Sequence, residues 1–165
     1  MLITLTGFMG SGKTSVGRIV ADALGCPFMD LDELVEKQAH KSVAELFATE
    51  GEAAFRTLEA AVLKKTVNKY AESTLVLALG GGTLGNPESA RLVHDKTLCI
   101  YLQASVDTLR SHLADTADTR PLLKGDWPAL LESRLPVYES TAAVVLDTDG
   151  LSPEEIADEI IIDCL

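Results

Sequence analysis

The sequence predicts an α/β fold in which helices cover both faces of a parallel sheet. Short apolar runs alternate along the chain with segments of helical periodicity, which is typical of this fold class. The runs are continuously apolar, as expected of parallel strands that are buried on both faces. A glycine-rich loop follows the first run, and sheets of this kind bind ligands at the carboxyl ends of their strands.

The elements can be assigned in order from these patterns. Strands are expected at residues 2–5, 27–29, 75–79, 97–102 and 143–146. Helices are expected from residue 12 to 24, at 35–39 and 43–47, from about 51 to 70, and at 86–93, 106–114, 127–138 and 153–162. We expect a single domain over residues 1–165, since no linker or repeat interrupts the alternation.

The glycine-rich loop is Gly7-Phe8-Met9-Gly10-Ser11-Gly12-Lys13-Thr14, which matches the phosphate-binding pattern Gly-x-x-x-x-Gly-Lys-Thr at every defined position. Its glycines let backbone N–H groups turn toward phosphate oxygens, and the next helix points its positive end at them. We expect Lys13 to reach the β- and γ-phosphates and Thr14 to coordinate Mg²⁺. The alternative is a glycine-rich turn without a ligand, but strand, loop and helix all fall where the pattern requires them.

Composition limits the possible functions. The chain has 165 residues and a formal net charge of −11 at pH 7, which argues against general nucleic-acid binding. No apolar run approaches the length of a membrane span, and the N-terminus lacks the basic region of a signal peptide. The three cysteines are dispersed, so we expect a reducing, cytoplasmic location. In so acidic a protein, the few arginines are candidates for binding anionic ligands.

Two acidic residues, Asp30 and Asp32, follow the second expected strand. One could hold the water shell of Mg²⁺ while the other takes a hydrogen bond from a substrate hydroxyl. The alternative is that Asp32 only caps a helix that starts at Glu33. No carboxylate ends the third strand, so Asp30 is the nearest substitute for the metal-binding acid that this loop usually accompanies.

Two further patterns indicate a ligand site. Arg56 and Glu59 are three residues apart, so they are neighbours on one helical face. The two residues form a weak surface ion pair, or else Glu59 holds Arg56 in place to bind a ligand carboxylate. Gly80-Gly81-Gly82 follows the third strand, either as a flexible turn or as a place where backbone approaches a ligand closely.

A polar segment from residue 115 to 126 lies between two expected helices and has the composition of a mobile loop. Its arginine, Arg120, could contact a transferred phosphate. His40, His94 and His112 lack the spacing of metal ligands, and we expect surface or packing roles for them.

Together these motifs resemble the shikimate kinase family over essentially the whole chain. The matching elements are the loop from Gly7 to Thr14, Asp30-x-Asp32, Gly51-Glu-x-x-Phe55-Arg56-x-x-Glu59, Gly80-Gly81-Gly82, Arg120-Pro121-Leu122-Leu123 and Arg134-x-x-x-Tyr138. The resemblance implies a three-layer P-loop kinase fold with five parallel strands in the order 2-3-1-4-5 and a mobile lid at about residues 113–126. It also implies phosphorylation of the shikimate 3-hydroxyl by ATP with Mg²⁺ as cofactor, a step of aromatic amino acid biosynthesis.

The resemblance also implies a role for individual residues. The expected ATP-binding residues are Gly10, Ser11, Gly12, Lys13, Thr14, Ser15 and Arg120. The expected shikimate-binding residues are Asp32, Arg56, Gly80, Gly81, Gly82 and Arg134. Lys13, Asp32 and Arg120 are the expected catalytic residues; Asp32 either acts as a base or only positions the hydroxyl. Thr14 is expected to bind the metal directly, and Asp30 to bind it through water.

Two points stay open. Arg110 and His112 both lie near the position at which the family places an arginine against adenine, and the spacing does not choose between them. The alternatives to a shikimate kinase are a gluconate-kinase-like enzyme and a catalytically idle nucleotide-binding module. We expect a monomer with shikimate and ATP as its ligands.

Overall fold

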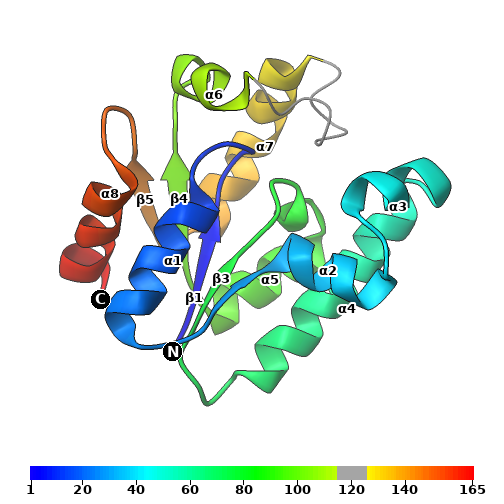
Figure 1. The fold of residues 1–165 in the computed structure, drawn as a ribbon, viewed down its shortest axis with the longest axis horizontal. Coiled ribbons are helices and arrows are strands. Elements are labelled where there is room, and N and C mark those ends of the chain that lie inside the picture. The colour runs from blue at the N-terminus through cyan, green and yellow to red at the C-terminus, as the bar shows by residue number, and fades with distance from the viewer. Residues whose placement is uncertain (115–125) are drawn as a thin grey trace.

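The computed structural model describes residues 1–114 and 126–165. Its five parallel strands are β1 (Leu2–Thr6), β2 (Phe28–Asp30), β3 (Leu75–Ala78), β4 (Leu98–Gln103) and β5 (Val144–Asp147). Their order in the sheet is β2-β3-β1-β4-β5, which confirms the expected topology. Because all five strands run the same way, their carboxyl ends lie along one edge, at the top of Figure 1.

Helices cover both faces of this sheet (Figure 1). The helices are α1 (Lys13–Leu24), α2 (Leu31–Ala39), α3 (Val43–Thr49), α4 (Glu52–Lys69), α5 (Pro87–Lys96), α6 (Val106–Leu113), α7 (Trp127–Thr141) and α8 (Pro153–Glu159). A short 3-10 turn, η1 (Thr83–Gly85), precedes α5, and a π-helical turn, η4 (Ile160–Cys164), follows α8. Within the described residues, no helix is long and apolar enough to cross a membrane.

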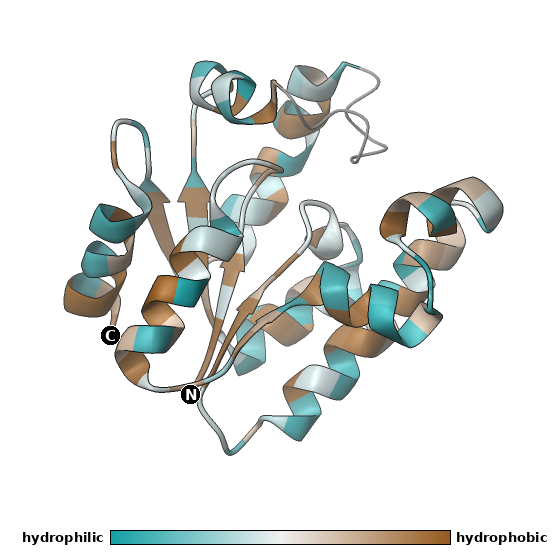
Figure 2. Ribbon diagram, in the orientation of Figure 1, coloured by the Kyte–Doolittle hydropathy of each residue, from teal (hydrophilic) through white to brown (hydrophobic). Residues whose placement is uncertain are grey.

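Two apolar layers hold the sheet between the helices. On one face, residues of α1 and α8 such as Val20 and Ile156 pack against Ile3 and Leu5 of β1. On the other face, α4, α5 and α7 pack against the alternate residues of the strands. The strands are therefore apolar on both sides, and Figure 2 shows them in brown between helices whose outer faces are teal.

The contact between α1 and β2 depends on a glycine in the middle of α1. A Cβ at Gly17 would lie 2.9 Å from Cδ1 of Phe28 and 3.2 Å from Cδ1 of Leu5. Glycine costs about 1 kcal/mol relative to alanine inside a helix. Here the missing side chain lets the helix approach the sheet closely.

The boundary between β2 and α2 differs from the sequence prediction. β2 extends to Asp30, which pairs with Ala78 of β3, and α2 begins immediately afterwards at Leu31. Asp30 is therefore the N-cap: its Oδ1 accepts hydrogen bonds from the backbone N–H of Asp32 at 2.9 Å and of Glu33 at 3.3 Å. The alternative that Asp32 caps the helix is wrong, because Asp32 already lies in the first helical turn.

Candidate active site

A cleft of about 700 Å³ opens at the carboxyl ends of β1, β2 and β3. It is lined by residues from the phosphate-binding loop, α2, α3, α4, the glycines after β3, α6 and α7. The predicted site residues among them are Gly10, Gly12, Lys13, Thr14, Ser15, Asp30, Asp32, Arg56, Gly80, Gly81, Gly82 and Arg134. Ser11 is buried within the loop, and Arg120 lies outside the described residues.

The phosphate-binding loop has the backbone that its glycines predict. Gly10 and Gly12 have φ values of 81° and 93°, and residues other than glycine adopt such values only at a cost in free energy. Lys13 Nζ donates hydrogen bonds to the carbonyl oxygens of Gly7 at 2.8 Å and Phe8 at 3.0 Å, so the ammonium lies over the loop. Within the described chain, the buried Ser11 Oγ has no hydrogen-bond partner. A phosphate in the loop would give this hydroxyl an acceptor.

Oxygen ligands for a divalent cation lie beside the loop. Thr14 Oγ1 donates a hydrogen bond to Oδ2 of Asp30 at 3.1 Å. The other carboxylate oxygen of Asp30 is used in capping α2, so Oδ2 is the one that faces the cleft. A hydroxyl and a carboxylate are the donor types that Mg²⁺ prefers. These two residues therefore fit the metal roles that the sequence predicted for them.

Asp32 is a half-buried acid whose pKa is raised. Burial raises the pKa of its carboxyl from 3.8 to about 6, and the negative charges of Asp30 and Glu59 add to this rise. The positive charges of Lys13 and Arg56 oppose the rise less strongly. A carboxylate whose pKa lies near neutrality can accept a proton from a reacting hydroxyl more readily than an ordinary aspartate.

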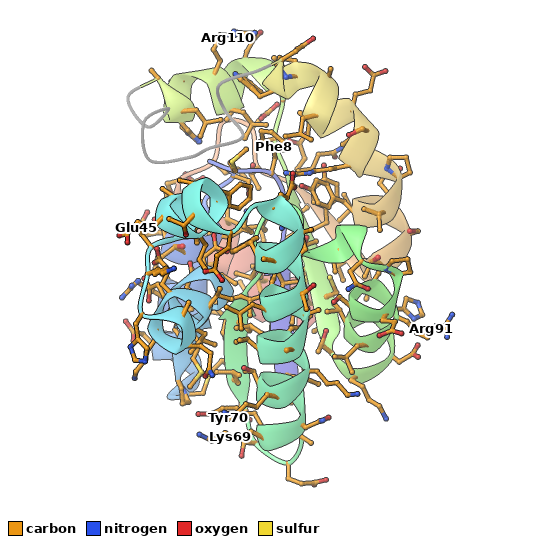
Figure 3. The ribbon with its side chains drawn as sticks, turned by 90° about the vertical axis from the view of Figure 1, so that its right-hand side faces the viewer. Phe8, Glu45, Lys69, Tyr70, Arg91 and Arg110 are labelled. Carbon is orange, nitrogen blue, oxygen red and sulfur yellow. The ribbon has the colours of Figure 1, made fainter. Side chains whose placement is uncertain are left out.

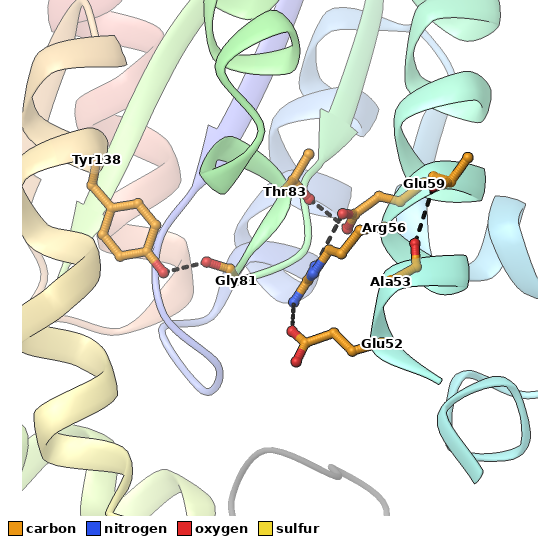
Figure 4. Close-up of polar contacts among 8 residues, drawn as sticks. Glu52, Ala53, Arg56, Glu59, Gly81, Thr83 and Tyr138 are labelled. Atoms are coloured by element: carbon orange, nitrogen blue, oxygen red, sulfur yellow. Dashed lines mark hydrogen bonds and ion pairs between the residues drawn. The ribbon is translucent and has the colours of Figure 1, made fainter. Parts of the chain in front are cut away.

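Arg56 and Glu59 form an ion pair in which Glu59 is the buried partner. Arg56 Nη1 lies 3.0 Å from Oε1 of Glu59, whose side chain is only 3% exposed. The other oxygen of Glu59 accepts a hydrogen bond from the hydroxyl of Thr83 at 2.9 Å (Figure 4). The alternative of a weak surface ion pair is wrong, because Glu59 lies inside the protein. The pair instead fixes the guanidinium group at the edge of the cleft.

The three glycines leave room for polar side chains. A Cβ at Gly82 would lie less than 3.0 Å from guanidinium nitrogens of both Arg56 and Arg134. A Cβ at Gly81 would lie 3.1 Å from Nη1 of Arg134. None of these glycines has a positive φ, so space rather than backbone conformation explains them. Two arginines from different helices, α4 and α7, thus converge on one point.

Tyr138 of α7 holds the glycine segment through a hydrogen bond. Its hydroxyl donates a hydrogen bond to the carbonyl oxygen of Gly81 (Figure 4). Burial raises the pKa of Tyr138 to about 12, so the phenol keeps its proton and stays a donor. The ring also packs on Tyr101 of β4, with centroids 5.0 Å apart. These contacts connect the glycine segment to the rigid sheet.

An aromatic stack joins the phosphate-binding loop to α6 and α7. The Phe8 ring lies 5.7 Å from the Trp127 ring, and the Arg134 guanidinium lies 5.7 Å from the Phe8 ring. The Arg110 guanidinium lies 5.3 Å from the centroid of the Trp127 ring. In Figure 3, Phe8 is seen in the interior and Arg110 at the outer end of the molecule.

The two candidates for adenine binding, Arg110 and His112, have different surroundings. Arg110 packs on Trp127 and is not among the residues that line the cleft. His112 does line it, and its Nδ1 lies 2.7 Å from the carbonyl oxygen of Gly10. Pro153 of α8 lines the same cleft. His112 is exposed, as expected of a surface residue, and it also lies at the border of the cleft.

The sequence reasoning missed the apolar wall of the cleft. Val43, Phe47 and Phe55 line it from α3 and α4, and the two phenylalanine rings pack 5.1 Å apart. The available signal was Phe55, which directly precedes the predicted ligand-binding Arg56. Phe47 lies eight residues earlier on a separate helix, and its position in space could not be inferred from that spacing.

The fold and the site define a P-loop kinase that acts on a small molecule: a phosphate-binding loop, an acid and two arginines line one cleft. A family model described as "Shikimate kinase" matches residues 9–165. The chain belongs to the shikimate kinase family.

Individual relatives agree with this assignment. The shikimate kinase of Streptococcus gordonii is 40% identical, over 98% of both chains. The shikimate kinase of Dictyoglomus turgidum is 37% identical, over 96% of this chain and 94% of the relative. Among solved structures, the shikimate kinase of Acinetobacter baumannii in complex with shikimate superposes with a TM-score of 0.90 at 32% identity, over 97% of this chain and 90% of that chain. A gluconokinase from Sinorhizobium meliloti superposes with a TM-score of 0.61 at 20% identity, over 95% of this chain and 87% of that chain. At this identity the similarity shows a shared fold alone.

Proposed function

We propose that the protein transfers the γ-phosphate of ATP to the 3-hydroxyl of shikimate, giving shikimate 3-phosphate and ADP. The observation that carries this proposal is the pair of guanidinium groups of Arg56 and Arg134, which converge at Gly82. Guanidinium groups bind carboxylates through two parallel hydrogen bonds, and shikimate carries one carboxylate. A carboxylate held at this point leaves the hydroxyl groups of the ring free to face Asp32 and the phosphate-binding loop.

We propose that ATP occupies the other end of the cleft. The loop N–H groups, Ser11 and Lys13 would bind its phosphates, since the positive N-terminus of α1 begins at this end of the cleft, directly after Gly12. His112 and Pro153 line the cleft and would contact adenine. Thr14 and Asp30 would hold Mg²⁺, which supplies positive charge against the β- and γ-phosphates when it is bound.

In the reaction, the shikimate O3 atom forms a bond to the γ-phosphorus while the bond from that phosphorus to the bridging oxygen of ADP breaks. The proton of the hydroxyl passes to the Asp32 carboxylate. The raised pKa of Asp32 supports this role, because a base works best when its pKa lies near the working pH. Lys13 stabilises the negative charge that gathers on the phosphate oxygens.

A coupled assay for ADP release tests the proposal. Purified protein is given ATP and Mg²⁺ with shikimate, gluconate or a nucleoside monophosphate, and the product is examined by phosphorus NMR. We expect turnover with shikimate and a phosphate ester at its 3-hydroxyl. The Lys13→Ala variant, purified in the same way, controls for contaminating kinases. Preferential turnover of gluconate or of a nucleotide would refute the proposal, as would an enzyme with no turnover on any of them.

A further inference from the structure

Thr83 is hydrogen-bonded to Glu59, the acid that contacts Arg56, and the proposed function does not use this hydrogen bond. The residue begins η1, directly after the three glycines, and is 1% exposed. Its Oγ1 donates a hydrogen bond to Oε2 of Glu59 at 2.9 Å, between positions 24 residues apart in the chain. The bond therefore connects the segment after β3 to α4, as Figure 4 shows.

Glu59 is the main partner that orients Arg56. The guanidinium also lies 3.5 Å from Glu52, but the Glu52 side chain is 53% exposed and water weakens such a pair. The Glu59 carboxylate is buried and engages Arg56 through Oε1 alone. A buried carboxylate needs a partner for each oxygen to stay in one orientation, and Thr83 supplies the partner for Oε2.

Gly80 lies beside the hydroxyl of Thr83 and beside two carboxylates. A Cβ at Gly80 would lie 3.0 Å from Oδ1 of Asp32, 3.1 Å from Oε2 of Glu59 and 3.1 Å from Oγ1 of Thr83. Three oxygens thus surround this glycine. A threonine hydroxyl has one proton to donate, and here it is donated to Glu59. Asp32 accordingly keeps its oxygens for other donors in the cleft.

We propose that Thr83 is a positioning residue for the substrate carboxylate. It holds Glu59, and Glu59 holds the Arg56 fork toward the point where Arg134 also arrives. Thr83 does not touch the substrate, so it acts on affinity for the carboxylated ligand and not on the transfer step. The inference rests on the proposed function, because it takes the ligand at this pair of arginines to be shikimate.

Replacement of the hydroxyl by a methyl group of the same shape tests this. Thr83→Val is expected to raise KM for shikimate about fivefold, while kcat and KM for ATP stay within about twofold of the wild type. Thr83→Ser keeps the hydroxyl and is expected to restore KM for shikimate. Thr66→Val is the matched control. Thr66 lies on α4 and is buried like Thr83, but its hydroxyl donates a hydrogen bond to the carbonyl oxygen of Val62 in its own helix, at 2.8 Å.

The outcomes separate the two claims. If the wild type phosphorylates shikimate and Thr83→Val keeps the wild-type KM, only the role of Thr83 is wrong. An equal rise of KM for shikimate and ATP in Thr83→Val would also overturn this role, because it would indicate a general loss of structure in the cleft. The same rise of KM for shikimate in Thr66→Val would overturn it too. A wild type without activity on shikimate would overturn the proposed function together with this inference. Should Thr83→Val fail to fold, Thr83→Ser against Thr83→Ala gives the same comparison.

Discussion

Replacement of Asp32 by asparagine should make the protein more stable and less active. Asn has nearly the same shape as Asp but carries no charge. The fold raises the pKa of Asp32 from 3.8 to about 6, so folding favours the protonated acid and disfavours the carboxylate. The stability associated with the raised pKa is present below about pH 4 and is lost as pH rises through 6. Above pH 6 the wild type carries the full penalty, which Asp32→Asn removes.

The size of the effect follows from the pKa. One pKa unit corresponds to about 1.4 kcal/mol, so the rise from 3.8 to about 6 amounts to about 3 kcal/mol in the free energy of unfolding at pH 8. At pH 5 about half of this remains, because Asp32 is then mostly protonated in the folded state. Asp32 lies in the first turn of α2, where a negative charge gains up to about 1 kcal/mol from the helix dipole. We therefore expect Asp32→Asn to be more stable by about 2–3 kcal/mol at pH 8 and by about 1–1.5 kcal/mol at pH 5.

Urea unfolding of both proteins at pH 5 and pH 8, without nucleotide and with EDTA, measures this difference. Asp22→Asn is the control, since Asp22 is exposed on α1 and its loss should change stability by less than about 0.5 kcal/mol. Turnover of Asp32→Asn should fall at least about a hundredfold, the contribution of a general base. A variant that is no more stable than the wild type at pH 8, or equally stabilised at both pH values, would refute the reasoning.

Three more substitutions test the remaining site residues. Lys13→Ala should abolish turnover and leave the circular dichroism spectrum unchanged, because the lysine lies over the loop; an unfolded variant would contradict its assignment. Arg134→Ala should raise KM for shikimate about ten- to a hundredfold and leave KM for ATP nearly unchanged, as expected for the loss of a charged hydrogen bond; an equal loss for both ligands would remove Arg134 from the acid site. Arg120 lies outside the described residues, and we expect Arg120→Ala to lower kcat more than it raises KM for shikimate; a wild-type kcat would rule out contact with the transferred phosphate.

The sequence predicted the fold well because its signals are local. The apolar strands, the loop at Gly7 to Thr14 and the helical spacings each occupy a few neighbouring residues, and the strand order followed from the family that they resemble. The exact end of β2 was not predictable in this way. It depends on the pairing of Asp30 with Ala78, a contact between residues far apart in the chain.

The sequence predicted most of the polar residues that line the cleft, but it did not predict which of them are buried. Spacing alone placed Arg56 and Glu59 on one helical face, yet it could not show that Glu59 is buried. In the fold, its carboxylate is hydrogen-bonded to Thr83, which comes from another segment. Similarly, Arg110 and His112 lie within one turn of α6, and spacing could not show that Arg110 packs on Trp127 while His112 lies beside the carbonyl oxygen of Gly10.

Gly17 sets a limit on how this enzyme can be engineered. Changing a helical glycine to alanine is a common way to raise thermal stability, since it improves helix propensity and restricts the unfolded chain. In α1 the added methyl group would meet the Phe28 ring and push the helix away from β2. Thr14 at the start of α1 and Asp30 at the end of β2 would then move apart, although neither had been changed. A variant library chosen on helix propensity alone would thus include a change that overpacks this contact and separates the oxygen pair beside the phosphates.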